Sequence, residues 1–510
     1  MNLKTTSVLL IKALSLTICL GVTVTSRAYD FSAPTASGHT LYFNIIDNTQ
    51  HYVETTFPFV SGTEITGNYI TGNLVVPDTV HYAGETWIVH AVGHATFLNC
   101  PGMTSCVLPE TVVSISGMNA FGQCSSMTSV TLPASLTSIG QYAFADCNAL
   151  QEVHFTGTAE QWCKINFVNW NANPLEQAHT LIINGDTVSD LMLQEGLDTI
   201  RLHAFIGCDL RSISIPRSVR MIDADAFKWC DSLTTVYYNA DSCGSHNFNW
   251  DEPIFVNCPR LTNFIFGDHV IQIPRNLCAG LQGIDTVWLP AGLRSIADGA
   301  FSDCSNLRHV DFFHTQLDTI AGGAFYRTAL EKVVLPSSCT YIGAGAFEDN
   351  DSLRYACIMA RNFTWGSGVF SDCPNIDTLR MYASAPPALT SVLPDSVHLI
   401  IPCGAGAYYA HEFPGMYNWD VITDVEEMPA VTVMVEATEG GVASVLSEPT
   451  CLNMSAEIMA VADSGWHFTI WSDGDTNNPR TLTVASDTAI VAYFASASGV
   501  VYIHDTVFGP

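Results

Sequence analysis

A phenylalanine followed three residues later by a cysteine marks a unit that recurs along most of this chain, as in AFADC at 143–147. The copies that keep both residues are Phe97/Cys100, Phe121/Cys124, Phe144/Cys147, Phe205/Cys208, Phe227/Cys230, Phe255/Cys258, Phe301/Cys304 and Phe370/Cys373. Two more copies, at Phe325 and Phe347, carry Thr328 and Asn350 in place of the cysteine. Uninterrupted neighbours are 22 to 24 residues apart, a period typical of a solenoid rather than of a disulfide scaffold.

The remainder of each unit is equally regular. After the cysteine comes an alternating segment ended by proline, such as SVTLP at 129–133 or KVVLP at 332–336, which predicts a short strand. A Leu-x-x-Ile pair such as Leu136/Ile139 follows it. The AFxxC piece, often preceded by glycine, predicts a single tight helical turn.

One unit cannot bury its own apolar side, so copies are expected to stack, with parallel strands about 4.8 Å apart. Fourteen strands are predicted, around Val76, Cys106, Val130, Val153, Leu181, Ile213, Val236, Phe264, Val287, Val310, Val333, Ala356, Leu379 and Leu399.

The pattern LxxVxLPxxLxxIxxxAFxxC, over about residues 74–402, resembles the BspA-like leucine-rich repeat family of bacterial surface proteins. The resemblance implies an α/β solenoid: a right-handed leucine-rich-repeat superhelix with a parallel concave β-sheet and short helical turns. It also implies adhesion to host matrix or to other cells. A repeat scaffold accepts many partners, so the pattern is more informative about fold than about function.

The composition along the chain predicts the domain organisation. We expect a β-hairpin N-terminal cap over 29–88, a solenoid over 89–402, a C-terminal cap and linker over 403–430, and a tail over 496–510. Residues 431–495 predict a small all-β domain that is similar to internalin-type bacterial extracellular repeats. Two stretched units predict insertions near 156–180 and 239–253, as plain loops or as loops that carry binding.

The first 28 residues predict a secretory signal peptide cleaved before Tyr29. Lys4 and Lys12 precede an apolar run at 13–24, and the small-residue site Ser26-Arg27-Ala28 follows it. No later apolar run reaches the ~18 residues that span a bilayer. We therefore expect a protein secreted or held at the outer cell surface, without a membrane span.

The charge of the chain argues against nucleic acid as a partner. The full chain has 19 Lys+Arg against 49 Asp+Glu, a net charge of −30, and cleavage removes three cations to leave 16 against 49, or −33. A field of this sign repels phosphate backbones.

The sequence offers no catalytic set, because GxSxG, HExxH, CxxC and a glycine-rich phosphate loop are all absent. We expect no enzyme, no catalytic residue and no cofactor. Asp473, Asp475 and Asn477 have the spacing of a calcium loop, but Val484 stands where a bidentate carboxylate belongs. A hairpin turn is the preferred interpretation, and no metal site is predicted.

Sixteen cysteines remain after signal cleavage, one fewer than the 17 of the full chain. Those of the repeat would stack with parallel Cβ vectors, which is unsuited to disulfides, so buried free thiols are expected there. The cysteines outside the repeat are the better disulfide candidates: Cys163, Cys243, Cys278 and Cys403.

The middle residue of each VxL strand is expected to point away from the core. This column reads Val107, Thr131, His154, Ile182, Ser214, Tyr237, Ile265, Trp288, Asp311, Val334, Cys357 and Arg380. Tyr237, Ile265 and Trp288 would be exposed on consecutive coils of the concave face, with Phe313 beside them. Exposed aromatic clusters mark interfaces, so these four residues are the candidate binding site for an extracellular protein or glycan. A covering loop, or a structural envelope protein without a dedicated ligand, remains the alternative.

Overall fold

A computed structural model describes residues 29–58, 70–241, 243–244, 253–384, 397–405, 409, 425–428, 431–449, 454–484 and 487–496. The predicted signal peptide, most of the 239–253 insertion, much of 403–430 and nearly all of the tail lie outside these residues. The chain divides into two compact units, residues 1–187 and 188–510, which are described separately. Among the residues described, no helix has the length and apolar character needed to span a membrane.

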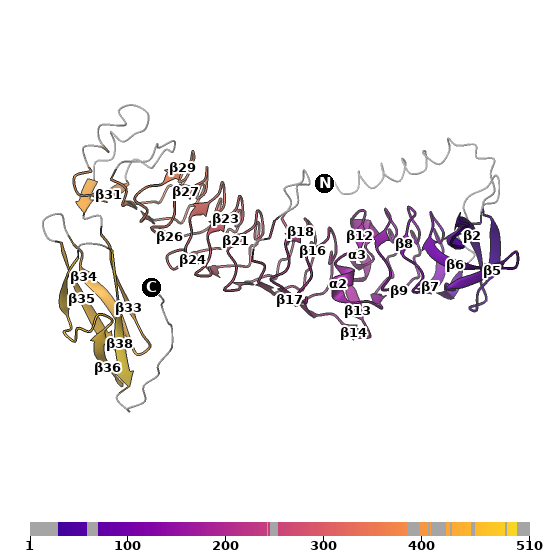
Figure 1. The fold of residues 1–510 in the computed structure, drawn as a ribbon. Helices are drawn as coiled ribbons and strands as arrows, with labels where there is room; N and C mark the ends of the chain where they lie inside the picture. The colour runs from indigo at the N-terminus through magenta and orange to yellow at the C-terminus, as the bar shows by residue number, and fades with distance from the viewer. Residues whose placement is uncertain are drawn as a thin grey trace. The chain divides into compact units, whose positions relative to one another are not determined.

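The first unit begins with a small mixed sheet (Figure 1, indigo). Strands β1 (Phe31–Pro34), β2 (Thr40–Asp47) and β3 (Tyr52–Thr56) are antiparallel, and β6 (Glu85–Val92) pairs in parallel with β3. Strand β5 (Thr79–Tyr82) forms a hairpin with β6. Phe43 and Val53 are fully buried under this sheet. The alternation predicts antiparallel hairpins over 29–88, but here β3 and β6 pair in parallel, and β6 extends to Val92.

The parallel strands that follow form what we call the main ladder. In the first unit it contains β4 (Thr71–Val75), β7 (Gly102–Val107), β9 (Ser129–Leu132), β11 (Glu152–Phe155) and β13 (Thr180–Ile183), and β14 (Asp186–Thr187) pairs antiparallel with β13. Cys106, Val130, Val153 and Leu181 stand in register and are fully buried. The inward column is therefore the one expected from the VxL alternation.

The Leu-x-x-Ile segments form a second ladder, which the sequence did not predict. It consists of two-residue parallel strands, which in the first unit are β8 (Ser114–Ile115), β10 (Ser138–Ile139) and β12 (Asn166–Phe167). Ile115 and Ile139 are in register and fully buried. Most coils thus contribute one strand to each of two parallel ladders.

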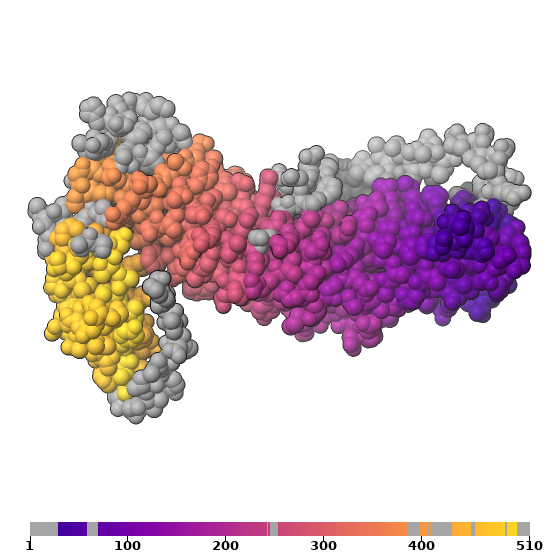
Figure 2. Space-filling model, in the orientation of Figure 1, coloured from indigo at the N-terminus to yellow at the C-terminus, as the bar shows by residue number. Residues whose placement is uncertain are grey.

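The second unit repeats this arrangement. Its main ladder comprises β15 (Asp190–Met192), β17 (Ser212–Ile215), β19 (Thr235–Tyr238), β20 (Asn263–Phe266), β22 (Thr286–Trp288), β24 (His309–Asp311), β26 (Lys332–Leu335), β28 (Tyr355–Ile358), β30 (Thr378–Met381), β31 (His398–Pro402) and β32 (Val425–Met428). Its hydrogen bonds are interrupted between β20 and β22 and between β24 and β26, so this ladder consists of three sheets. Its second ladder comprises β16 (Thr199–Ile200), β18 (Met221–Ile222), β21 (Gln272–Ile273), β23 (Ser295–Ile296), β25 (Thr319–Ile320), β27 (Tyr341–Ile342) and β29 (Thr364–Trp365). Figure 2 shows the atoms of the chain as spheres in the orientation of Figure 1.

The AFxxC segments form single hydrogen-bonded turns rather than helices. The amide of Cys124 donates to the carbonyl of Phe121 at 3.3 Å, and Asn119 and Gln123 on either side of Phe121 have positive φ angles of 58° and 63°. The phenylalanine rings stack from coil to coil, for example Phe121 on Phe144 with centroids 5.0 Å apart. Each turn that keeps the phenylalanine therefore places a large buried ring in its coil.

The 156–180 insertion is packed within the first unit instead of projecting as a loop. It contains α2 (Ala159–Trp162), η1 (Trp170–Ala172), α3 (Leu175–Ala178) and strand β12 of the second ladder. Trp162 is fully buried, with its ring centroid 5.2 Å from that of Phe155. A capping box between Thr158 and Gln161 fixes the start of α2.

The repeat cysteines are buried free thiols, as predicted, and they have a second role that the sequence did not show. The thiol of Cys124 donates to the carbonyl of Phe97 in the preceding coil at 3.1 Å. The same contact joins Cys147 to Phe121, Cys230 to Phe205, Cys258 to Phe227 and Cys373 to Phe347, each at 3.1 Å. Asn350 keeps the contact with its amide, which donates to the carbonyl of Phe325 at 2.8 Å.

Three of the four disulfide predictions are wrong, and one is confirmed. Cys403 is disulfide-bonded, whereas Cys163, Cys243 and Cys278 are free and buried. Cys278 occupies the phenylalanine position of a divergent turn, because the thiol of Cys304 in the next coil donates to the carbonyl of Cys278 at 3.0 Å. Cys163 directly follows α2 and is fully buried in the core. A cysteine outside the AFxxC position can therefore still be a core residue.

We expect the free thiols to be unreactive in the native protein. Burial raises the pKa of Cys304 to about 12 and that of Cys243 to about 11, so the reactive thiolate is scarce at pH 8. Iodoacetamide labelling at pH 8, followed by mass spectrometry, should leave the fourteen free cysteines of the described residues unmodified until denaturant is added. Rapid labelling of Cys124 in the folded protein would contradict the packing role.

The C-terminal module is all-β, as predicted. Its sheets consist of β33 (Val433–Ala437), β38 (Thr488–Ser496) and β36 (Trp466–Trp471), and of β34 (Gly441–Ser447), β35 (Ser455–Ala462) and β37 (Arg480–Thr483). Ile458, Trp471 and Ile490 lie in its core.

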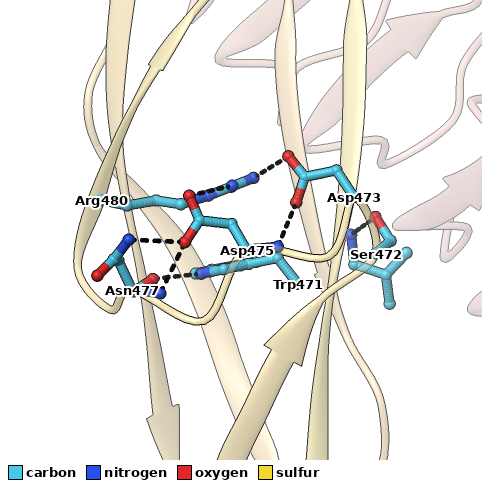
Figure 3. Close-up of polar contacts among 7 residues, drawn as sticks. Trp471, Ser472, Asp473, Asp475, Asn477 and Arg480 are labelled. Atoms are coloured by element: carbon cyan, nitrogen blue, oxygen red, sulfur yellow. Dashed lines mark hydrogen bonds and ion pairs between the residues drawn. The ribbon is translucent and has the colours of Figure 1, made fainter.

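Between β36 and β37, the loop with calcium-like spacing binds an arginine of the chain itself (Figure 3). The guanidinium of Arg480 lies 2.6 Å from a carboxylate oxygen of Asp473 and 3.0 Å from one of Asp475. Asn477 donates from its backbone and side-chain amides to Asp475, both at 2.8 Å. A side-chain cation therefore occupies the position that the spacing would give to a metal ion. Within the described ranges, no group of three or more His, Cys, Asp or Glu could hold a metal.

Candidate binding surface

The central column consists of the middle residues of the VxL segments, which project away from the core. It is the third residue of most main-ladder strands, but in β7 it is the last residue, Val107. In the first unit the column is only partly open: Val107 is 37% exposed and Ile182 is 9% exposed. His154 lies 3.0 Å from the carboxylate of Glu152 on the same strand. The pairing with Glu152 provides a local partner for the histidine.

In the second unit the central column presents its largest apolar side chains on three consecutive coils. Tyr237 is 44%, Ile265 46% and Trp288 73% exposed, whereas their neighbours in the strands, such as Val236 and Val287, are buried. Tyr237 and Ile265 are register partners on β19 and β20. Trp288 ends β22 and is the register partner of Asp311 on β24. The alternation of the strands thus leaves an exposed apolar row on this face.

Phe313 lies just after β24 and is half-buried. Its amide donates to the carboxylate of Asp311 at 3.0 Å, and its ring meets that of His314 edge to face at 5.2 Å. This short turn directs Phe313 along the same face as Trp288.

A cavity of about 460 Å³ lies over β22 to β30 and is also lined by Thr432, Val433, Met434 and Glu448 of the C-terminal module. Trp288 and Phe313 border it, but Tyr237 and Ile265 do not. The structure therefore divides the four predicted residues into two that border a cavity and two that lie outside it on neighbouring strands. The principal polar and aromatic lining residues are Asp311, Lys332, Tyr355, Arg380, Tyr382 and Glu448.

The chemistry of the cavity combines aromatic rings with cations. The ammonium of Lys332 lies 5.2 Å from the ring centroid of Tyr355, and the guanidinium of Arg380 lies 5.2 Å from that of Tyr382. Burial raises the pKa of Tyr355 to about 12 and raises the pKa of Tyr382 well above its usual value. Both phenols therefore carry their protons at neutral pH and can act as hydrogen-bond donors.

Sequence reasoning missed Tyr355 and Tyr382 because neither occupies the central column. Tyr355 is the first residue of β28, and Tyr382 follows the last residue of β30. Their positions in the strand pattern do carry a signal, because Arg380 and Tyr382 are two residues apart and so share one side of an extended segment. Reading the whole face, instead of one column, would have included them.

Two family models match the chain. The model described as a BspA type leucine rich repeat region, in six copies, matches residues 89–179, 183–254 and 249–377. The model described as a divergent InlB B-repeat domain matches residues 431–498. Together they account for the solenoid coils and for the all-β module.

Several solved structures are similar to the chain at low identity. A leucine-rich repeat protein from Bacteroides ovatus is 19% identical, with 80% of this chain and 84% of that chain covered and a TM-score of 0.38. The pneumococcal vaccine antigen PcpA is 13% identical, with 79% and 99% covered and a TM-score of 0.40. A leucine rich cell surface protein from Faecalibacterium prausnitzii is 17% identical, with 66% and 96% covered and a TM-score of 0.24. No curated protein matches the chain.

Proposed function

Because the chain belongs to the BspA-type leucine-rich repeat proteins, a cell-surface family, we propose that it is a secreted or surface-displayed binding protein. Its ligand would be an extracellular protein or glycan, of host matrix or of other cells, recognised by the main-ladder face of the second unit. The signal-peptide pattern of residues 1–28 supports export. The proposal assigns no reaction to the chain.

The observation that carries this proposal is the exposed apolar row. An isolated exposed apolar residue needs no explanation, but Tyr237, Ile265 and Trp288 are 44%, 46% and 73% exposed on consecutive coils. Tyrosine and tryptophan supply large, rigid contact areas and are enriched among the residues that dominate binding energy. The ladder beneath holds their backbones by hydrogen bonds, so little order has to be gained on binding.

A binding screen with a matched surface control tests the proposal. The full chain and its Tyr237→Ala/Trp288→Ala double variant would be applied to arrays of matrix proteins and glycans. We expect the double variant to bind at least about tenfold more weakly to the ligand that the wild type selects.

The control is Tyr341→Ala, because Tyr341 is 43% exposed but belongs to the second ladder. It should bind within about twofold of the wild type. A ligand whose binding survives the double substitution would place recognition elsewhere, and the absence of any ligand for the wild type would favour a purely structural envelope protein.

A further inference from the structure

Two buried hydrogen-bond donors in the cavity over β22 to β30 have no acceptor among the described residues. They are Nε of Arg380 and the hydroxyl of Tyr382. Tyr382 as a whole is only 3% exposed. Buried donors are normally satisfied, since leaving one without an acceptor costs stability. Both residues line the same cavity, so an acceptor that enters it and displaces the atoms covering these two donors could satisfy them together.

One of the two donors belongs to the cation Arg380, which favours an anionic acceptor at that atom. Arg380 is a permanent cation, and Lys332 borders the same cavity. Of the two carboxylates in the lining, Asp311 is already engaged by the amide of Phe313 at 3.0 Å and by His314 at 3.6 Å. Glu448 is exposed, so solvent screens its repulsion of an anion. In a chain of net charge −30, the lining of this cavity thus balances two cations, Lys332 and Arg380, against these two carboxylates.

We propose that this cavity binds a saccharide that carries a carboxylate, an acidic glycan. This inference rests on the proposed binding function and specifies the ligand class. The carboxylate accepts hydrogen bonds from Nε of Arg380 and from the hydroxyl of Tyr382, as charge-assisted pairs. Trp288, which is 73% exposed, offers its face to the apolar C–H side of another sugar ring.

The dimensions of the site favour an oligosaccharide over a single sugar. Trp288 on β22 and Arg380 on β30 are four main-ladder strands apart, which is about 20 Å at the usual strand spacing. One monosaccharide cannot contact both residues, whereas a short chain of sugars can.

The backbone of the ladder argues against an acidic peptide as the occupant. Peptides commonly bind a sheet by adding a strand to a free edge. Strand β28 is already paired on both sides, with β26 and with β30, so its backbone offers no such edge. Recognition here depends on side chains alone, through rings and cationic heads, which suits a saccharide.

The test compares an acidic saccharide with its uncharged ester and with an acidic peptide. Isothermal titration of the full chain would use tetragalacturonate, its fully methyl-esterified form and tetraglutamate. The acid should bind at least about tenfold more tightly than the ester, because the ester cannot form the charge-assisted pair. Equal binding of acid and ester, absence of binding to the acid, or binding to tetraglutamate alone would overturn the proposal.

Two substitutions localise the binding. Tyr382→Phe removes only the hydroxyl and should weaken binding of the acid about fivefold. Arg380→Gln should weaken binding of the acid about tenfold, and neither substitution should change binding of the ester. Tyr341→Phe is the control and should change nothing. If both site variants bind the acid like the wild type, the cavity is not its site.

The outcome also distinguishes the two proposals. If the array finds a ligand that depends on Trp288 but tetragalacturonate does not bind, the acidic-glycan inference fails and the binding function stands. If neither the array nor the titration finds a ligand for the wild type, both fail.

Discussion

Replacing Phe347 by alanine should lower the free energy of unfolding of the second unit by about 4 kcal/mol. Phe347 is fully buried, and its ring lies between those of Phe325 and Phe370, with centroids 5.4 and 5.5 Å away and interplanar angles of 6° and 14°. Phe312 meets it edge to face at 6.2 Å. The backbones of the adjacent coils are tied by ladder hydrogen bonds, so the cavity left by the ring cannot collapse.

The matched control for this substitution is Phe363→Ala. Phe363 lies in the next coil, is half-buried and meets Trp365 at 5.7 Å. We expect a loss of about 1 kcal/mol or less there. Urea titration of the full chain, combined with hydrogen exchange of peptides from 301–381, measures both effects and shows whether the loss spreads along the stack. A loss below about 2 kcal/mol for Phe347→Ala would mean that neighbouring rings move into the space.

The sequence predicted the main ladder because its inward residues alternate over four or five positions and repeat in register. Val130, Val153 and Val236 illustrate this, since each is fully buried at the predicted place. The second ladder was missed because its strands contain only two residues, too few for alternation to appear. Its pairing, as in Ile320 with Ile342, depends on the stacking of whole coils.

The cysteine errors have a related origin. The sequence pattern recognises a core position by its spacing from phenylalanine, but the turn that contains Cys278 has lost that phenylalanine. Two hydrogen bonds identify it as a copy of the same turn: the thiol of Cys304 donates to its carbonyl at 3.0 Å, and its own amide donates to the carbonyl of Ala300 at 2.8 Å. Stacking thus preserves a structural position after its sequence signature has gone.

The candidate site could be predicted only in part. Trp288 was found because it stands in the central column, but the donors of the cavity come from three different strand positions in neighbouring coils. Which of them share one cavity depends on register and on burial, as for Tyr382, which is 3% exposed despite lying beyond the end of β30. Periodicity assigns a residue to a face, whereas the unsatisfied donors emerge only from the packed structure.

Replacing Gly343 by alanine should destabilise the second unit by about 3 kcal/mol. A Cβ atom at this position would lie 2.5 Å from the carbonyl carbon of Ala321 and 2.9 Å from the Cα of Gly322, and closer still to the amide nitrogen of Gly322. All three are backbone atoms of the preceding coil. They cannot rotate away, because the amide of Gly343 donates to the carbonyl of Ile320 at 2.7 Å and fixes the approach of the two coils.

The repeat pattern alone would not predict this cost, because Ala297 and Ala321 stand directly after the isoleucine of the second ladder in earlier coils, as Gly343 does. The control is Gly292→Ala, where the added Cβ would meet only the carbonyl oxygen of Asp268, at 3.8 Å. This variant should be neutral or more stable by up to about 1 kcal/mol, since alanine restricts the unfolded chain. Urea titration of both variants gives the comparison. Equal stabilities would show that the coils can separate at this corner at little cost, and so that the hydrogen bond to Ile320 does not hold them at a fixed distance.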